Sequence, residues 1–221
     1  MLFKYWRTRR PTSGANAHPT KHLILCATLA WGCALGLPAQ AQQADIAGID
    51  YPEMIKAEGV PLVLNGSGIS YKAVAKLYTM ALYLPQKSDQ TPVVLKQEGP
   101  KQLQFVILRG ARIDELGRTI SVGIERNNPR EEFFRLIPAI QRMGEQFSRI
   151  NRFATGDRFS IEWVPDRGTL FRLNGRPVDL PIADPGFFQA VLNVWLGKAP
   201  ASENLKTALL DYHPPLLNVL D

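Results

Sequence analysis

The side chains that most enzymes use for covalent or metal chemistry are confined to the N-terminal end of this chain. Both cysteines (Cys26 and Cys33) and two of the three histidines (His18 and His22) lie within the first 41 residues. The rest of the chain therefore has no thiolate nucleophile, no disulfide and no cysteine-based metal site. A Ser-His-Asp triad or a histidine-rich zinc site would have to form around His213, close to the C-terminus. We expect no metal and no cofactor, and most hydrolase and metalloenzyme chemistries are excluded.

A tyrosine hydroxyl is the first candidate for noncovalent chemistry. Tyr78 lies in a run of aromatic and apolar residues, 74–84 (VAKLYTMALYL), which ends at Pro85 and predicts a β-strand. If the face of this strand that carries Tyr78 lines a cleft, the hydroxyl suits a carboxylate or a phenol; the alternative is a core tyrosine bonded to a backbone carbonyl. Side chains alternate along a strand, so the two faces consist of Lys76, Tyr78, Met80 and Leu82, and of Leu77, Thr79, Ala81 and Tyr83.

Cationic side chains that could hold an anion beside this hydroxyl are Lys72, Arg109 and Arg112. Arg109 ends an apolar strand, predicted over 101–108, at a corner that faces the predicted helices. The alternative for Arg109 is an ion pair with Asp114 or Glu115. An apolar cleft with one cation and one hydroxyl is typical of a site for an amphipathic anion.

The net charge of +6 arises mainly at the N-terminus. Residues 1–41 hold five basic side chains and no acidic one, so the remaining 180 residues carry 21 basic and 20 acidic side chains. A nucleic-acid binder needs a surplus of cations to neutralise phosphates. The nearly neutral remainder therefore argues against a nucleic-acid partner.

Residues 1–41 predict a cleavable secretory signal peptide. Basic residues precede an uncharged apolar run of 15 residues, Leu23–Leu37, and Ala39-Gln40-Ala41 puts small residues at a signal peptidase site. We therefore expect cleavage after Ala41 and a periplasmic mature protein, 42–221, with no membrane span. The alternative, a transmembrane anchor, is disfavoured because the apolar run, at about 1.5 Å per residue, is shorter than a hydrocarbon core of about 30 Å.

The mature chain has the length of one domain, and its elements follow an α+β order. Asn65–Gly68 is interpreted as a turn, since its glycines accept positive φ, and Asp114 as a helix N-cap. We expect an antiparallel sheet covered on one face by helices. Strands are predicted over 62–64, 74–84, 101–108, 157–164, 169–173 and 176–180, and helices over 91–97, 114–127, 130–147, 184–197 and 203–210.

Short motifs along the mature chain resemble, in order, those of the bacterial exported chalcone isomerase-like proteins. The resemblance covers roughly residues 45–212. It implies an open-faced β-sandwich, in which a large antiparallel sheet and a layer of helices enclose a ligand cleft. The motifs are Leu64–Gly68, Ala81–Leu84, Gly156-Asp157, Trp163–Thr169, Asn174-Gly175, Phe187-Phe188 and Trp195–Pro200.

Chalcone isomerases close a flavanone ring by adding a phenolate to an enone without metal or cofactor, which requires a cation and hydroxyl donors. The resemblance puts Ser70 where the plant enzymes carry this cation, an arginine. It puts Tyr78 where the plant strand carries a threonine, or Thr79 if the register differs by one residue. Residues 112–117, where the plant enzymes have a catalytic tyrosine, contain none. The resemblance thus implies the fold without flavonoid isomerase activity.

Members of this family that have lost the isomerase residues include fatty-acid-binding proteins. The resemblance therefore predicts a non-catalytic protein that binds a small amphipathic carboxylate. One alternative is a cofactor-independent isomerase (an intramolecular lyase) with Arg109 or Lys72 as the cation and Tyr78 as the acid. Another is an envelope interaction protein with a filled cleft and an exposed apolar patch. The predicted binding residues are Tyr78, Arg109, Thr79, Ser70 and Lys72.

Overall fold

The computed structural model describes residues 44–211, so the predicted signal peptide and His213 lie outside the described residues. The strands are β1 (Ala44–Ile46), β2 (Ile49–Tyr51), β3 (Met54–Ala57), β4 (Val60–Lys72), β5 (Ala75–Leu84), β6 (Lys101–Ile107), β7 (Ala111–Arg112), β8 (Arg152–Phe153), β9 (Arg158–Val164), β10 (Gly168–Leu173) and β11 (Arg176–Pro177). The helices are α1 (Thr91–Lys96), α2 (Ile113–Asn127), α3 (Arg130–Ser148), α4 (Pro185–Leu196) and α5 (Glu203–Leu209).

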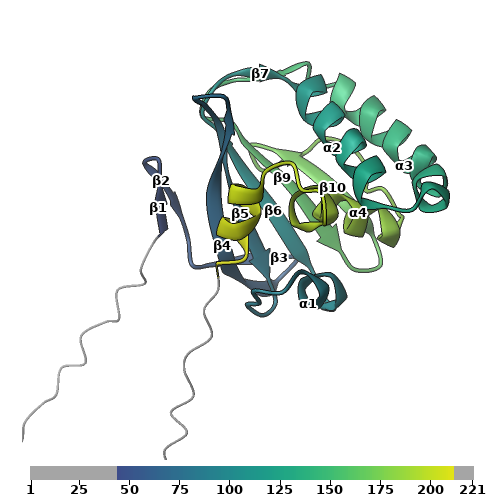
Figure 1. Cartoon of the computed structure of the whole chain (residues 1–221), viewed down its shortest axis with the longest axis horizontal. Helices are drawn as coiled ribbons and strands as arrows, with labels where there is room; N and C mark the ends of the chain where they lie inside the picture. The colour runs from purple at the N-terminus through teal and green to yellow at the C-terminus, as the bar shows by residue number, and fades with distance from the viewer. Residues whose placement is uncertain (1–43, 212–221) are drawn as a thin grey trace, which may run out of the picture. The chain divides into compact units, whose positions relative to one another are not determined.

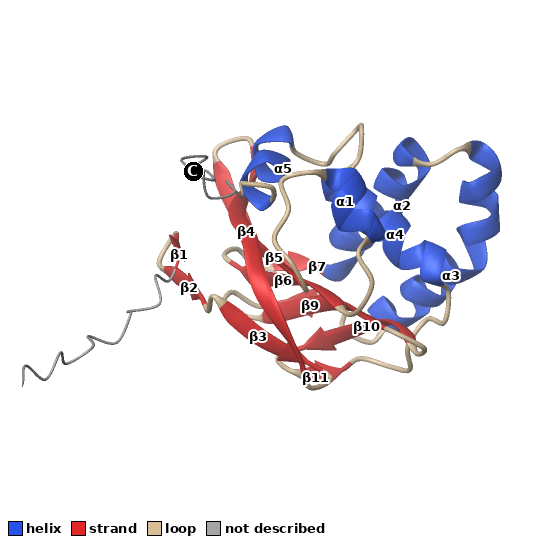
Figure 2. Ribbon diagram, turned by 90° about the horizontal axis from the view of Figure 1, so that it is seen from below, coloured by secondary structure: helices blue, strands red, loops and turns tan. Residues whose placement is uncertain are grey.

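Seven strands form one antiparallel sheet in the order β11-β10-β9-β6-β5-β4-β3 (Figure 1). Two further pairs, β1 with β2 and β7 with β8, make small two-stranded sheets. Helices α1 to α4 lie on one side of the large sheet (Figure 2). This arrangement confirms the predicted α+β fold, because an antiparallel sheet is covered on one face by a layer of helices.

Strand β5 is central to the sheet and changes its degree of burial along its length. From Thr79 to Leu84 every residue is buried, whereas the four residues before Thr79 are exposed or partly exposed. Met80 and Leu82 pack into the core beneath the helices, and Ala81 and Tyr83 pack into a second apolar cluster on the other face. The predicted alternation of the strand is therefore confirmed, and its less buried first half is where a cavity can form.

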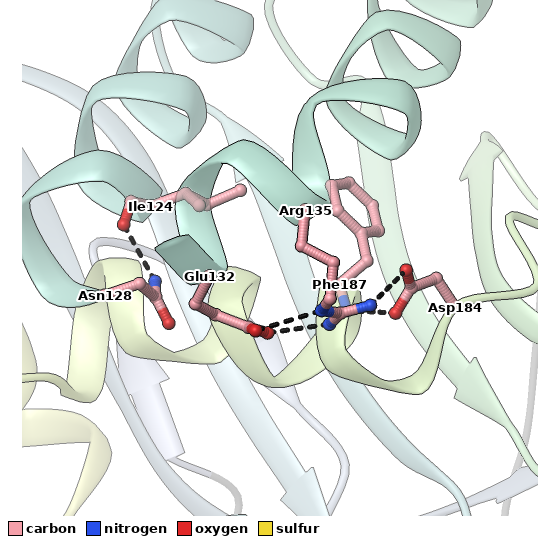
Figure 3. Close-up of polar contacts among 6 residues, drawn as sticks. All are labelled: Ile124, Asn128, Glu132, Arg135, Asp184 and Phe187. Atoms are coloured by element: carbon pink, nitrogen blue, oxygen red, sulfur yellow. Dashed lines mark hydrogen bonds and ion pairs between the residues drawn. The ribbon is translucent and has the colours of Figure 1, made fainter. Parts of the chain in front are cut away.

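Helix α4 is the innermost helix of the layer, with eight of its twelve residues buried. Asp184, where the sequence predicts the start of this helix, is its N-cap and accepts a hydrogen bond from the backbone N–H of Phe187 at 3.1 Å. Arg135 of α3 binds both Asp184, at 3.0 Å, and Glu132 (Figure 3). Gly186 leaves room for this arginine, since a Cβ there would lie 2.2 Å from Arg135 Nη2. The contacts join α3 to the start of α4.

The predicted turn at Asn65–Gly68 is wrong, because strand β4 continues through these residues, although its register with β5 shifts between Leu64 and Gly66. The turn that reverses the chain lies beyond them, between β4 and β5. A Cβ at Gly66 would lie 2.3 Å from the carbonyl oxygen of Ala208, so this glycine lets helix α5 approach the strand. The Asn65 amide donates to the carbonyl of Leu209 at 2.7 Å. This segment is therefore the docking point for α5.

The remaining predicted elements are confirmed apart from their ends. Helix α2 begins one residue earlier than predicted, and Arg112 rather than Asp114 is its N-cap residue. Asp114 lies in the first turn, where its carboxylate accepts a hydrogen bond from Arg112 at 3.0 Å. The strand predicted over 176–180 is shortened to the two residues of β11.

Candidate functional site

A cavity of about 360 Å³, here called the β5–α2 pocket, opens where the burial of β5 decreases. Its walls come from the end of β4, the first half of β5, the second half of β6, strands β7 and β8, and the first turns of α2. The pocket therefore lies between the large sheet and the helix layer. A cavity of this size is at the small end of the range for ligand sites.

Apolar and aromatic side chains form the inner surface of the pocket, namely Tyr78, Phe105, Ile107, Leu116 and Phe153. The ring of Tyr78 meets Phe105 edge to face, with 5.4 Å between the centroids. Phe105 makes the same kind of contact with Trp195 of α4, also at 5.4 Å. These contacts connect the pocket wall to the core and hold its aromatic rings in fixed positions.

The hydroxyl of Tyr78 is the central polar group of the pocket. It accepts a hydrogen bond of 3.3 Å from the indole N–H of Trp195, a residue with no exposed surface. Ser70 is the cross-strand partner of Tyr78 and also interacts with its hydroxyl. Burial raises the pKa of Tyr78, and the hydrogen bonds from Ser70 and Trp195 offset only part of this effect. The phenol therefore stays protonated and can donate its own hydrogen bond.

Four cations and one carboxylate lie around the pocket. Lys72 lies 3.8 Å from Glu115, while Arg112 pairs with Asp114, which holds the pKa of that carboxyl below its usual value. The other two cations are Arg109 and Arg118, and within residues 44–211 no carboxylate lies at ion-pair distance from either. The predicted alternative of an Arg109 pair with Asp114 or Glu115 is therefore not formed.

The structure brings together four of the five predicted binding residues. Ser70, Lys72, Tyr78 and Arg109 all line the β5–α2 pocket. Thr79 does not, because it points to the other face of the sheet, where its hydroxyl lies 2.7 Å from the Tyr51 hydroxyl. Thr79 is fully buried there. The resemblance allowed either Tyr78 or Thr79 to carry the hydroxyl of the site, depending on the register, and only Tyr78 lines the pocket.

The sequence reasoning missed one residue that lines the pocket, Arg118, and one that lies behind its wall, Trp195. Arg118 lies three residues after Glu115 on α2, so both project from the same side of the helix, and helical periodicity could have identified it. Trp195 was assigned to the core, which is correct for its ring. Its indole N–H nevertheless determines how the Tyr78 hydroxyl is oriented, and no local pattern in the sequence indicates that contact.

Two other hollows are larger but lack this combination of groups. One, of about 460 Å³, lies between α2 and α3 and shares Arg112 and Arg118 with the β5–α2 pocket. The other, of about 740 Å³, is lined mainly by amide and cationic side chains where α1, α2 and α4 end. Basic residues at helix C-termini offset the helix dipoles and need no ligand. Among these three, only the β5–α2 pocket has a phenol hydroxyl, that of Tyr78, together with both arginines that lack an ion-pair partner among residues 44–211, Arg109 and Arg118.

The described part of the chain contains neither a cluster of metal-ligating side chains nor a helix able to span a membrane. Within residues 44–211, no three His, Cys, Asp or Glu side chains gather as a metal site would require. No helix in this part combines the length and the apolar character needed to cross a bilayer.

A model of the chalcone isomerase-like family matches residues 43–211 of the chain. Among solved structures, a fatty-acid binding protein of Arabidopsis thaliana is similar, with a TM-score of 0.61 and 11% sequence identity. The alignment covers 77% of this chain and 96% of the plant protein. At this identity the likeness establishes a common fold. The curated proteins contain no match.

Proposed function

This chain belongs to the chalcone isomerase-like family, and we propose that it binds a small amphipathic carboxylate, of the fatty-acid type, in the β5–α2 pocket. The observation that carries this proposal is the pairing of an apolar cavity with two arginines, Arg109 and Arg118, that have no carboxylate partner within the described residues. Arginine binds carboxylates through two parallel hydrogen bonds. A ligand carboxylate would supply the missing partner.

The chemistry of the pocket supports one orientation of such a ligand. The head group would meet Arg109 and Arg118 at the mouth, with Tyr78 donating to a carboxylate oxygen. The tail would contact Phe105 and Phe153 of the interior. The plant fatty-acid binding protein of similar fold is consistent with this use of the cavity.

We also propose that the protein acts outside the cytoplasm, because residues 1–41 have the features of a cleavable export signal. The mature chain would then begin at Gln42. Its ligand would be an amphiphile that is available in the periplasm.

Native mass spectrometry of the protein purified from the periplasm, followed by denaturing extraction, tests the proposal. We expect a stoichiometric fatty acid, and an N-terminus at Gln42. The double variant Tyr78→Phe/Arg109→Ala should lose the ligand. The matched control Tyr83→Phe/Arg142→Ala should keep it, because neither residue lines the pocket. A protein that is empty and takes up no added palmitate would refute the proposal.

A second candidate is an intramolecular lyase, favoured by the cross-strand pairing of Ser70 with Tyr78, since both residues line the pocket. Two polar groups that reach one point meet the minimum geometry for acid catalysis. Incubation of the extracted molecule with the wild type and with Tyr78→Phe separates the two functions. Conversion to an isomer by the wild type alone would favour the enzyme, whereas recovery of the unchanged molecule supports binding.

A further inference from the structure

The hairpin between β4 and β5 ends in an exposed apolar tip. Its sequence is Lys72-Ala73-Val74-Ala75-Lys76, so three apolar residues lie between two lysines. Val74 is 96% exposed, more than any other large apolar residue among those described, and Tyr71 beside the tip is 52% exposed. Neither side chain packs in the hydrophobic core. A single exposed valine carries no inference by itself; what distinguishes this tip is that lysines flank it and a cationic pocket mouth lies beside it.

The tip is held in place by the strand ladder. The register of the ladder shifts between Ser70 and Tyr71, and pairing then continues with Tyr71 opposite Lys76 and Lys72 opposite Ala75, up to the two turn residues. Ala73 adopts a φ of 54°, in the left-handed region, which lets the chain reverse within two residues. Val74 is therefore presented at the end of a hairpin that is paired up to its turn.

The tip adjoins the mouth of the β5–α2 pocket. Tyr71 and Lys72 both line the pocket, and strand β7 with the start of α2 lies at the same end of the sheet (Figure 1). The charged residues at this end include the cations Lys72, Lys76, Arg109, Arg112, Arg118 and Arg152 and the carboxylates Asp114, Glu115 and Asp157. The apolar tip is thus accompanied by a net positive charge.

We propose that this end of the molecule docks on an anionic lipid surface. Val74 would enter the boundary between head groups and acyl chains, Tyr71 would lie at the interface, and the cations would face the lipid phosphates. A projecting tip beside a cationic mouth fits a broad anionic surface. The inference rests on the proposed function in one respect: docking would bring the pocket mouth to the layer that contains amphipathic carboxylates.

Co-sedimentation with lipid vesicles tests the docking surface. The protein is expressed with its own N-terminus, so that every variant carries the same N-terminal residues. We expect it to bind mixed phosphatidylcholine–phosphatidylglycerol vesicles, and to bind pure phosphatidylcholine vesicles far more weakly. The variant Val74→Asp/Lys76→Gln should lower the affinity for mixed vesicles at least tenfold, because it removes the inserted side chain and one interfacial cation.

The matched control is Leu180→Asp/Lys96→Gln, which changes a leucine that is 70% exposed and a lysine, both away from the hairpin. This control should bind mixed vesicles as the wild type does. Equal binding by Val74→Asp/Lys76→Gln and the wild type would overturn the inference. Absence of wild-type binding to mixed vesicles would overturn it as well.

Uptake of free palmitate in vesicle-free buffer separates this inference from the proposed function. Neither Val74 nor Lys76 lines the pocket, so their double variant should bind palmitate with wild-type affinity. Palmitate binding without vesicle binding would refute the docking surface alone. Hairpin-dependent vesicle binding without palmitate binding would refute the proposed function and leave the docking surface supported.

Discussion

On one face of β5 the hydroxyl of Tyr78 opens onto a cavity with cations at its mouth, and on the other face the hydroxyl of Thr79 is closed off by Tyr51. Both hydroxyls belong to neighbouring residues of one strand, and both have a hydrogen-bond partner. They differ in their surroundings. The Tyr78 face has two arginines without an ion-pair partner among residues 44–211 next to an apolar space, whereas the Thr79 face is a packed cluster in which Tyr51 and Tyr83 have no exposed surface. A hydroxyl group therefore suggests a binding site only where space and charge accompany it.

The largest effect that separates the two faces is expected from the cations of the pocket. In the variant Arg109→Gln/Arg118→Gln we expect the dissociation constant for palmitate to rise about a hundredfold, because a hydrogen bond to a charged group contributes about 1.5 kcal/mol or more. Isothermal titration calorimetry measures this constant. The midpoint of urea unfolding should not change, since neither arginine has an ion-pair partner among residues 44–211.

The control for this variant is Arg142→Gln/Arg149→Gln. Both arginines pair with Asp179 and neither lines the pocket. We expect this control to bind palmitate as tightly as the wild type. If the two double variants lose the same amount of palmitate affinity, the effect comes from the net charge of the protein. The position of Arg109 and Arg118 beside the pocket would then not explain binding.

The next effect, smaller for each pH unit, is expected at alkaline pH and arises on the closed face. Burial raises the pKa of Tyr51 to about 12, from an ordinary value of 10.0, although the hydrogen bond with Thr79 opposes the rise. The folded protein therefore holds this proton more tightly than the unfolded chain does. The contribution to stability is complete below pH 10 and is lost as the pH rises towards 12.

Urea unfolding at successive pH values checks this linkage. Above pH 10, Tyr51 should lower the free energy of unfolding by about 1.4 kcal/mol per pH unit. Burial raises the pKa of Tyr83 as well, so both tyrosines contribute to the slope. In Tyr51→Phe the alkaline slope should decrease. An unchanged slope in that variant would mean that Tyr51 has the same pKa in the folded and unfolded states, so that this face of the sheet is not closed to water.

The contrast between the faces also explains which features the sequence could predict. Alternation along one strand depends only on local geometry, so it correctly separated Tyr78 from Thr79. The cap at Asp184 is local too, because its partner is three residues away. Asn65 and Gly66 were wrongly interpreted as a turn. The contacts that determine their role are made with α5, more than 140 residues further along the chain, and no local pattern shows them.

The candidate site follows the same division. Tyr78 and Arg109 could be predicted from a strand pattern and a strand end, and both line the pocket. The contact of Tyr78 with Trp195 joins residues 117 positions apart, and only packing of α4 on the sheet brings them together. That Lys72 pairs with Glu115 depends on where α2 begins relative to β4. Such information is absent from local patterns.

The smallest effect is expected from exchanging a single hydroxyl on each face. Thr79→Val keeps the shape of the side chain but removes the hydrogen bond of 2.7 Å with Tyr51. We expect the free energy of unfolding to fall by about 1 kcal/mol, because the Tyr51 hydroxyl stays buried without this partner. Chemical denaturation measures the loss. Palmitate affinity should remain at the wild-type value, since Thr79 does not line the pocket.

Tyr78→Phe is the matching change on the open face, and it should lower palmitate affinity as well as stability. It removes the acceptor of the indole N–H of Trp195, a residue with no exposed surface, so the free energy of unfolding should also fall by about 1 kcal/mol. Palmitate affinity should fall severalfold, by about 1 kcal/mol, because a donor to the carboxylate is lost. If instead Tyr78→Phe lowers stability and leaves affinity unchanged, then Tyr78 is a core residue like Thr79. The arginines alone would then define the head-group site.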